Sequence, residues 1–261
     1  PAAVRSAFLH RGSAHIRYHD SLQIQVMGLD LHMTTAGQIN GSIKGDSARI
    51  NSTIGLSEIT AGFGVGEETV SIRRSSARVL GGSVGAVLDL STRAGTVKAC
   101  TIRASGIDLA GLYALQPSPR GSLSGTAGVV FIPTGGFRPG SPLSGKGRMD
   151  AKNVSASDTP IQKTLILSLF LPGLSSTAFR TVTADFRIEE GRTVVIDSLR
   201  GTGDPLEMTL RGWVDMNGKL DQRLEGALTA DFTKTLGKMV SGSLERLPDG
   251  RRSFACRIRG K

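Results

Sequence analysis

The feature that most constrains this chain is an alternation of apolar and polar residues that recurs along it and is interrupted by glycines. It is clearest after residue 180, where Val182, Ala184, Phe186 and Ile188 alternate with polar residues. Successive side chains of a strand point to opposite faces of a sheet, so the alternation predicts strands with one buried face. Long amphipathic helical patterns are nearly absent. The chain is therefore predicted to be mainly β.

Turn signals separate the alternating stretches of the C-terminal half. Glu190-Gly191 predicts one turn and Asn217-Gly218 predicts a hairpin, with strands expected over 208–216 and 224–232. We therefore predict a long curved antiparallel sheet, either a taco-like groove or an open sandwich, with one or two short helices.

The N-terminal half shows the same pattern less cleanly. The glycine strings that begin at Gly62, Gly81 and Gly201 lack the strand-then-helix setting of phosphate-binding loops, so they are predicted to be turns and bulges. Strands are expected over Ala14–Tyr18, Leu22–Leu29, Gln38–Ile43, Ala48–Ile54, Thr69–Ile72 and Ser83–Leu90.

Two segments are predicted to be helical. In Ile107–Leu115, Asp108 is a candidate N-cap and Pro117 ends the helix. The second helix is expected at about 158–171, with Pro160 in its first turn. Its apolar residues are predicted to plug one end of a β core, the alternative being a lid or a membrane-contacting element. These residues are Ile161, Leu165, Ile166, Leu169 and Phe170.

The net charge of +10 raises nucleic acid or an anionic membrane as a partner. Nucleic-acid modules interleave basic residues with exposed aromatics, whereas Tyr18, Tyr113 and Trp213 lie far apart, so nucleic acid is not expected. The denser basic patches form either a solvated face or a contact with anionic headgroups. They comprise Arg73, Arg74 and Arg78, and then Arg246, Arg251, Arg252, Arg257, Arg259 and Lys261.

No motif for catalysis, a cofactor or a metal ion stands out, so the protein is predicted not to be an enzyme. Cys100 and Cys256 have no zinc-like spacing, and whether they pair stays open. The longest apolar run, 164–174, is about half of the roughly 20 residues that a membrane span requires. Because the chain begins at Pro1, we expect an internal piece of a longer protein, with any anchor outside it.

Several stretches, taken in order, resemble the C-terminal region of the AsmA-like family of bacterial envelope proteins, which includes TamB. They are LGGSVGAVLDL from Leu80, ASGIDLAGLYAL from Ala104, RGSLSGTAGVVF from Arg120, SGKGRMDAKNVSASD from Ser144, and the strand, turn and hairpin pattern over 179–232. The resemblance divides the chain into an N-terminal β-rich segment, 1–103, and an AsmA-like region, 104–261.

The resemblance implies a protein anchored in the inner membrane of a Gram-negative bacterium and exposed in the periplasm. It also implies an apolar β-groove that holds or conducts phospholipid acyl chains between the inner and outer membranes. Expected groove residues are Val182, Phe186, Ile188, Val194, Ile196, Met208, Leu210, Val214, Leu224 and Leu228. One alternative is an envelope scaffold that assembles outer-membrane proteins by sheet-edge pairing. A weaker alternative is a sugar-binding adhesin-like module.

Overall fold

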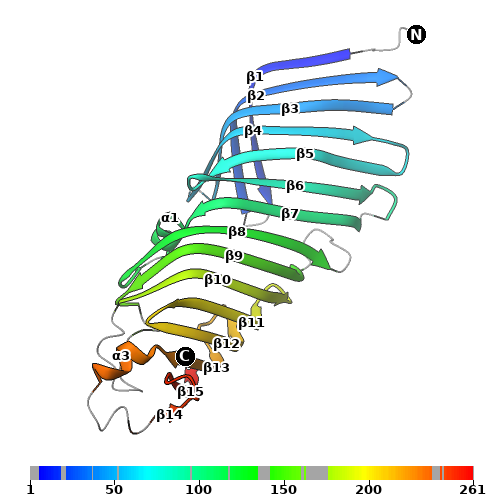
Figure 1. The fold of residues 1–261 in the computed structure, drawn as a ribbon. Helices are drawn as coiled ribbons and strands as arrows, with labels where there is room; N and C mark the ends of the chain where they lie inside the picture. The colour runs from blue at the N-terminus through cyan, green and yellow to red at the C-terminus, as the bar shows by residue number, and fades with distance from the viewer. Residues whose placement is uncertain are drawn as a thin grey trace. The chain divides into compact units, whose positions relative to one another are not determined.

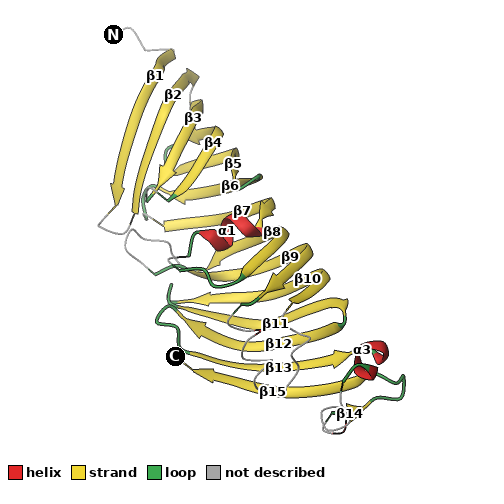
Figure 2. Ribbon diagram, turned by 90° about the vertical axis from the view of Figure 1, so that its left-hand side faces the viewer, coloured by secondary structure: helices red, strands yellow, loops and turns green. Residues whose placement is uncertain are grey.

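A computed structural model confirms the predicted fold class. Fifteen strands form one antiparallel sheet in chain order, except that β15 lies between β13 and β14 (Figure 1). The described chain contains two short helices, α1 and α3 (Figure 2). The structure describes residues 6–18, 22–36, 38–51, 53–94, 96–116, 118–134, 142–159, 162, 176–236, 242 and 244–260.

The chain divides by its backbone contacts into two compact units. Unit 1 comprises 1–107 and 130–141, and unit 2 comprises 108–129 and 142–261. The first division falls four residues after the boundary expected at 103, and strand β8 contributes to both units.

Unit 1 is built from seven consecutive antiparallel strands that bend along their length (Figure 1). Register shifts in the pairs β1–β2, β4–β5 and β5–β6 mark β-bulges, which bend a strand locally. The strands are β1 (Ser6–Tyr18), β2 (Leu22–Ala36), β3 (Gln38–Ile50), β4 (Ile54–Val65), β5 (Thr69–Val79), β6 (Gly82–Ser91) and β7 (Thr96–Asp108).

Unit 2 contains the two described helices and the remaining complete strands. The helices are α1 (Leu109–Ala114) and α3 (Ala230–Lys234). The strands are β9 (Ser144–Ser157), β10 (Ser176–Glu189), β11 (Thr193–Asp204), β12 (Leu206–Asp215), β13 (Leu220–Leu228), β14 (Glu245–Arg246) and β15 (Arg252–Gly260), and β8 spans Ser122–Thr134.

Local signals for turns and caps were accurate. Glu190 and Gly191 turn the chain with φ values of 51° and 62°. At the predicted hairpin, the Asp215 carboxylate accepts hydrogen bonds from the backbone N–H groups of Asn217 and Lys219. The Asp108 carboxylate accepts from two N–H groups in the first turn of α1, as an N-cap should.

Other expectations were wrong. The strand predicted over 224–232 ends at Leu228, and α3 begins at Ala230 after the N-cap residue Thr229. The strand predicted over 48–54 is the end of β3 followed by the turn into β4, and β4 itself was missed. The N-terminal strands are also longer than expected because bulges let them continue past breaks in the alternation.

Several glycines lie inside strands beside phenylalanine rings, and one of them, Gly201, belongs to a glycine string that was predicted to form turns and bulges. Gly201 lies in β11, and a Cβ at this position would meet the Phe179 ring at 2.9 Å. Gly41, Gly147 and Gly226 likewise have no room for a side chain, because the rings of Phe63, Phe186 and Phe254 respectively lie against them. Each pair joins neighbouring strands, an arrangement in which the ring covers backbone that glycine leaves bare.

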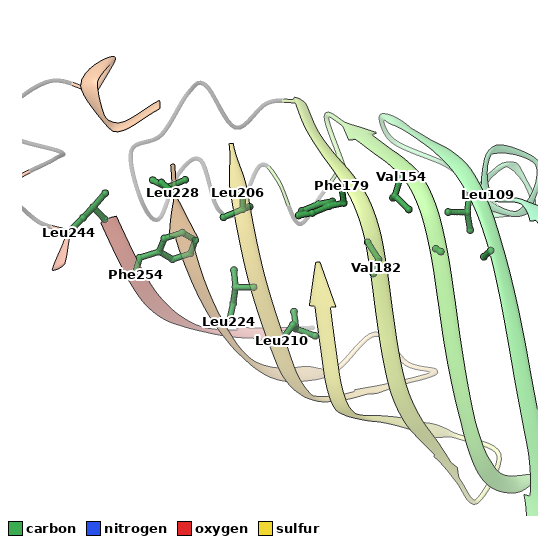
Figure 3. Close-up of a cluster of buried hydrophobic side chains, with 12 residues drawn as sticks. Leu109, Val154, Phe179, Val182, Leu206, Leu210, Leu224, Leu228, Leu244 and Phe254 are labelled. Carbon is green, nitrogen blue, oxygen red and sulfur yellow. The ribbon is translucent and has the colours of Figure 1, made fainter. Parts of the chain in front are cut away.

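The hydrophobic core lies in unit 2, on one face of its sheet (Figure 3). Leu206, Leu224 and Leu228 are 1%, 0% and 0% exposed, and Phe254 from β15 packs into the same cluster. The other members include Leu109, Ala127, Ala151, Val154, Phe179, Val182, Leu210 and Leu244.

Replacing Gly226 by valine should destabilise unit 2, because the added side chain would overlap the buried Phe254 ring. We expect Gly226→Val to lower the free energy of unfolding by about 1–3 kcal/mol, measured by urea denaturation. Gly260→Val in β15 is the matched control, since nothing lies within 4 Å of its added Cβ. If both variants lowered the free energy of unfolding equally, the close packing of Gly226 against Phe254 would not be the cause.

Candidate functional site

A line of apolar residues crosses the seven strands β1–β7 of unit 1. The cross-strand register places each residue directly opposite the next, so all project from one face of the sheet. We call this line the apolar row, and it consists of Ala7, Met33, Gly41, Phe63, Ile72, Leu88 and Cys100.

Further apolar residues flank this row on the same face. One flanking line joins Leu9, Leu31, Ile43 and Ala61, and another joins Ile39, Val65, Val70, Leu90 and Val97. Leu9 is 45% exposed and Ile39 is 39% exposed. The apolar row is half-buried at every position.

The apolar faces of the two units differ in how deeply their side chains are buried. Every described member of the buried hydrophobic cluster belongs to unit 2, and none belongs to unit 1. Fully buried hydrophobic residues of unit 1, within the described ranges, are Ala48, Ala77, Ile107 and Phe131. Among the described residues, the apolar face of unit 1 is therefore not part of the buried core cluster.

The opposite face of unit 1 is polar and self-paired. Arg78 donates to the Glu58 carboxylate at 2.9 Å, and the Thr60 and Ser76 hydroxyls lie 2.9 Å apart. Two exposed apolar side chains also lie on this face, Phe8 at 74% and Val87 at 49% exposed.

The groove residues predicted from the sequence all lie in unit 2. Val182, Leu210, Leu224 and Leu228 are buried members of its core, so a ligand would have to displace their packing to reach them. The remaining predicted residues are half-buried, and these are Phe186, Ile188, Val194, Ile196, Met208 and Val214.

Sequence reasoning missed the apolar row because β-bulges and glycines interrupt the alternation in unit 1. A usable signal was nevertheless present in β6, where Val84, Ala86, Leu88 and Leu90 alternate with other residues. Only the strand register shows that this segment continues a line running from β1 to β7.

The proposed plug residues Ile161, Leu165, Ile166, Leu169 and Phe170 lie outside the described residues. Gln162, within the same segment, is described and is 4% exposed. Its side-chain amide donates to the Ala156 carbonyl at 2.7 Å and to the Thr177 hydroxyl at 3.0 Å. Gln162 thus connects the end of β9 to the start of β10 through hydrogen bonds.

Ion pairs cover much of the polar face of unit 2. Arg257 binds the Asp221 carboxylate through two bonds of 2.7 and 2.6 Å, which lower the pKa of Asp221 below the ordinary carboxyl value. Hydrogen bonds to Asp197 raise the pKa of Arg187 in the same way. The C-terminal basic patch is therefore partly neutralised by acidic neighbours.

Other candidate chemistry is sparse among the described residues. The His10 ring lies 2.7 Å from the Asp30 carboxylate, but no described group of three or more possible ligands could hold a metal ion. Cys100 and Cys256 are free, and burial raises the pKa of both thiols. No described helix combines the length and apolarity needed to cross a bilayer.

Comparison with known proteins adds no relative: no family model, no curated protein and no solved structure matches this chain.

Proposed function

We propose that the apolar face of unit 1 holds the acyl chains of phospholipids. The observation that carries this proposal is the apolar row, which crosses seven strands without joining a closed core. A large exposed apolar surface on a folded protein is a binding site or an aggregation hazard. Hydrocarbon chains fit a surface whose side chains offer dispersion contacts and few hydrogen bonds.

The apolar row is long enough to accommodate the full length of an acyl chain. Neighbouring strands lie about 4.8 Å apart, so a row across seven strands extends for roughly 29 Å. One leaflet of a bilayer contributes about half of the roughly 30 Å hydrocarbon thickness. An acyl chain lying along the row would therefore be in contact with apolar side chains over its whole length.

The energetics favour such a guest. Each methylene moved from water onto the row contributes about 0.8 kcal/mol when it is fully buried, and correspondingly less when one side remains exposed. The Phe63 ring lies against Gly41 and supplies a broad apolar contact. Phospholipid headgroups would remain in water beyond the edge of the face.

The cellular setting proposed for this function is the periplasm of a Gram-negative bacterium, between the inner and outer membranes. This part rests on the resemblance to AsmA-like proteins. In that setting the protein acts as a non-enzymatic carrier or conduit and needs no cofactor, because moving a lipid breaks no covalent bond.

A polar substitution in the apolar row should weaken lipid binding. Leu88→Asn places an amide that lacks a hydrogen-bond partner beneath the acyl chain, at a cost of roughly 1–3 kcal/mol. We therefore expect about a tenfold loss of affinity for a fluorescent phospholipid analogue, and less phospholipid copurifying in native mass spectrometry. Ile72→Asn, directly opposite Leu88, should behave similarly.

The matched control is Val87→Asn, on the other face of the same strand. Val87 is already 49% exposed, so this variant should bind lipid like the unmodified protein. Circular dichroism checks that all variants remain folded. The proposal fails if purified protein carries no phospholipid, or if the Leu88 and Val87 variants lose affinity equally.

A second candidate function, assembly of outer-membrane β-barrel proteins, rests on the edge strand β15. Over Phe254–Gly260, the described strands pair with β15 on one side only, through β13. Unpaired N–H and C=O groups at such an edge can accept a strand from another protein. Arg257 and Arg259 stand along this segment and discourage indiscriminate pairing.

A photo-crosslinking amino acid at Ile258 tests this second function. Edge pairing predicts capture of a β-barrel protein, identified by mass spectrometry, and no such capture from the interior-strand position Asp197. Crosslinks to lipid alone, or equal capture from both positions, would count against assembly.

A further inference from the structure

Three arginines lie side by side on the polar face of unit 2, directly opposite one another on adjacent strands. Arg211 of β12 is paired in register with Arg223 of β13, and Arg223 with Arg257 of β15. Directly opposed residues have their Cβ atoms about 5 Å apart, and like charges at this spacing destabilise a sheet. The arrangement therefore carries an electrostatic cost that a bound anion would relieve.

The three arginines differ in whether a nearby carboxylate binds them. Arg257 is held by Asp221, and Arg223 lies 2.9 Å from Glu225 on its own strand, with both of those side chains more than half exposed. Arg211 has no hydrogen-bonded or ionic partner within the described chain. The Arg211 guanidinium is thus the one of the three that no described residue engages.

The arginines line an open hollow of about 610 Å³. Its other walls include Trp213, Asp221 and Gly212. Three arginines against one aspartate leave a net charge of +2 in the lining. The hollow is thus electropositive, with an aromatic wall on one side.

The geometry points to a binding site for a phosphoryl group in this hollow. Planar guanidinium groups bind phosphate oxygens bidentately, and a phosphoryl group with a charge of about −1.5 to −2 matches the excess positive charge. Arg211 and Arg223 supply the principal contacts, with Arg257 shared between the anion and Asp221. The site lies in unit 2 and is independent of the acyl-chain surface of unit 1.

Trp213 makes the inference directly measurable, because it is the single tryptophan of the chain. Its fluorescence should change saturably on titration with inorganic phosphate or pyrophosphate, or with vesicles that contain phosphatidic acid. Saturation by the soluble ions identifies free phosphate as the ligand source. A response to phosphatidic acid vesicles, but not to the ions or to phosphatidylcholine vesicles, identifies a lipid headgroup.

Arg223→Gln and Arg211→Gln should each weaken binding by about tenfold or more, since each removes a charge-assisted contact. Arg180→Gln, an exposed arginine on β10 outside the hollow, is the charge-matched control and should bind almost normally. Higher salt should weaken binding by the unmodified protein.

Thermal unfolding supplies a second readout. Without ligand, Arg223→Gln should unfold at the same temperature as the unmodified protein or higher, because one like-charge neighbour is gone. Phosphate should raise the midpoint of the unmodified protein and not that of the variant. Absence of a saturable Trp213 response, equal weakening by Arg180→Gln, or a lower midpoint for Arg223→Gln would overturn the assignment.

Discussion

An apolar face on a β-sheet must be covered, and this constraint separates the two halves of the protein. In unit 2 the core around Leu206, Leu224 and Leu228 removes the face from water. In unit 1 comparable rows of apolar side chains cross β1–β7 without entering that core. Because burial of apolar area is the dominant favourable contribution to folding and association, a molecule that covers this face would gain free energy by removing its apolar area from water.

Much of the fold was predictable from local sequence, because strand alternation, turns and caps are local effects. The Asn217-Gly218 hairpin and the Asp108 cap are examples. The boundary of β13 was not predictable, since Ala230 and Phe232 continue the alternation although they belong to α3. The open site was missed for a non-local reason: only register aligns Phe63, Ile72 and Leu88. The alternation identified the predicted groove residues as one apolar face of a sheet. It did not show that several of them are buried in the core of the protein.

The positions of individual glycines and arginines explain more than their numbers in the composition. Gly147 and Gly226 lie inside strands, where phenylalanine rings occupy the space beside them. Turn propensities do not predict this contact. The basic residues also differ in their partners: Arg187 and Arg251 are bound by carboxylates, whereas Arg211 lies opposite Arg223, which in turn lies opposite Arg257. The distinction between paired and unpaired arginines, which decides where an anion can bind, depends on cross-strand geometry.

The central claim, that acyl chains lie on the apolar face of unit 1, is tested most directly at Cys100, an endogenous thiol in the apolar row. An environment-sensitive fluorophore attached there, in a Cys256→Ala background, can be challenged with phospholipids brominated along their acyl chains. The account predicts strong quenching at Cys100 and weak quenching when the label is moved to Thr101→Cys in a Cys100→Ala, Cys256→Ala chain. Equal quenching at the two positions, or none at Cys100, would contradict the claim.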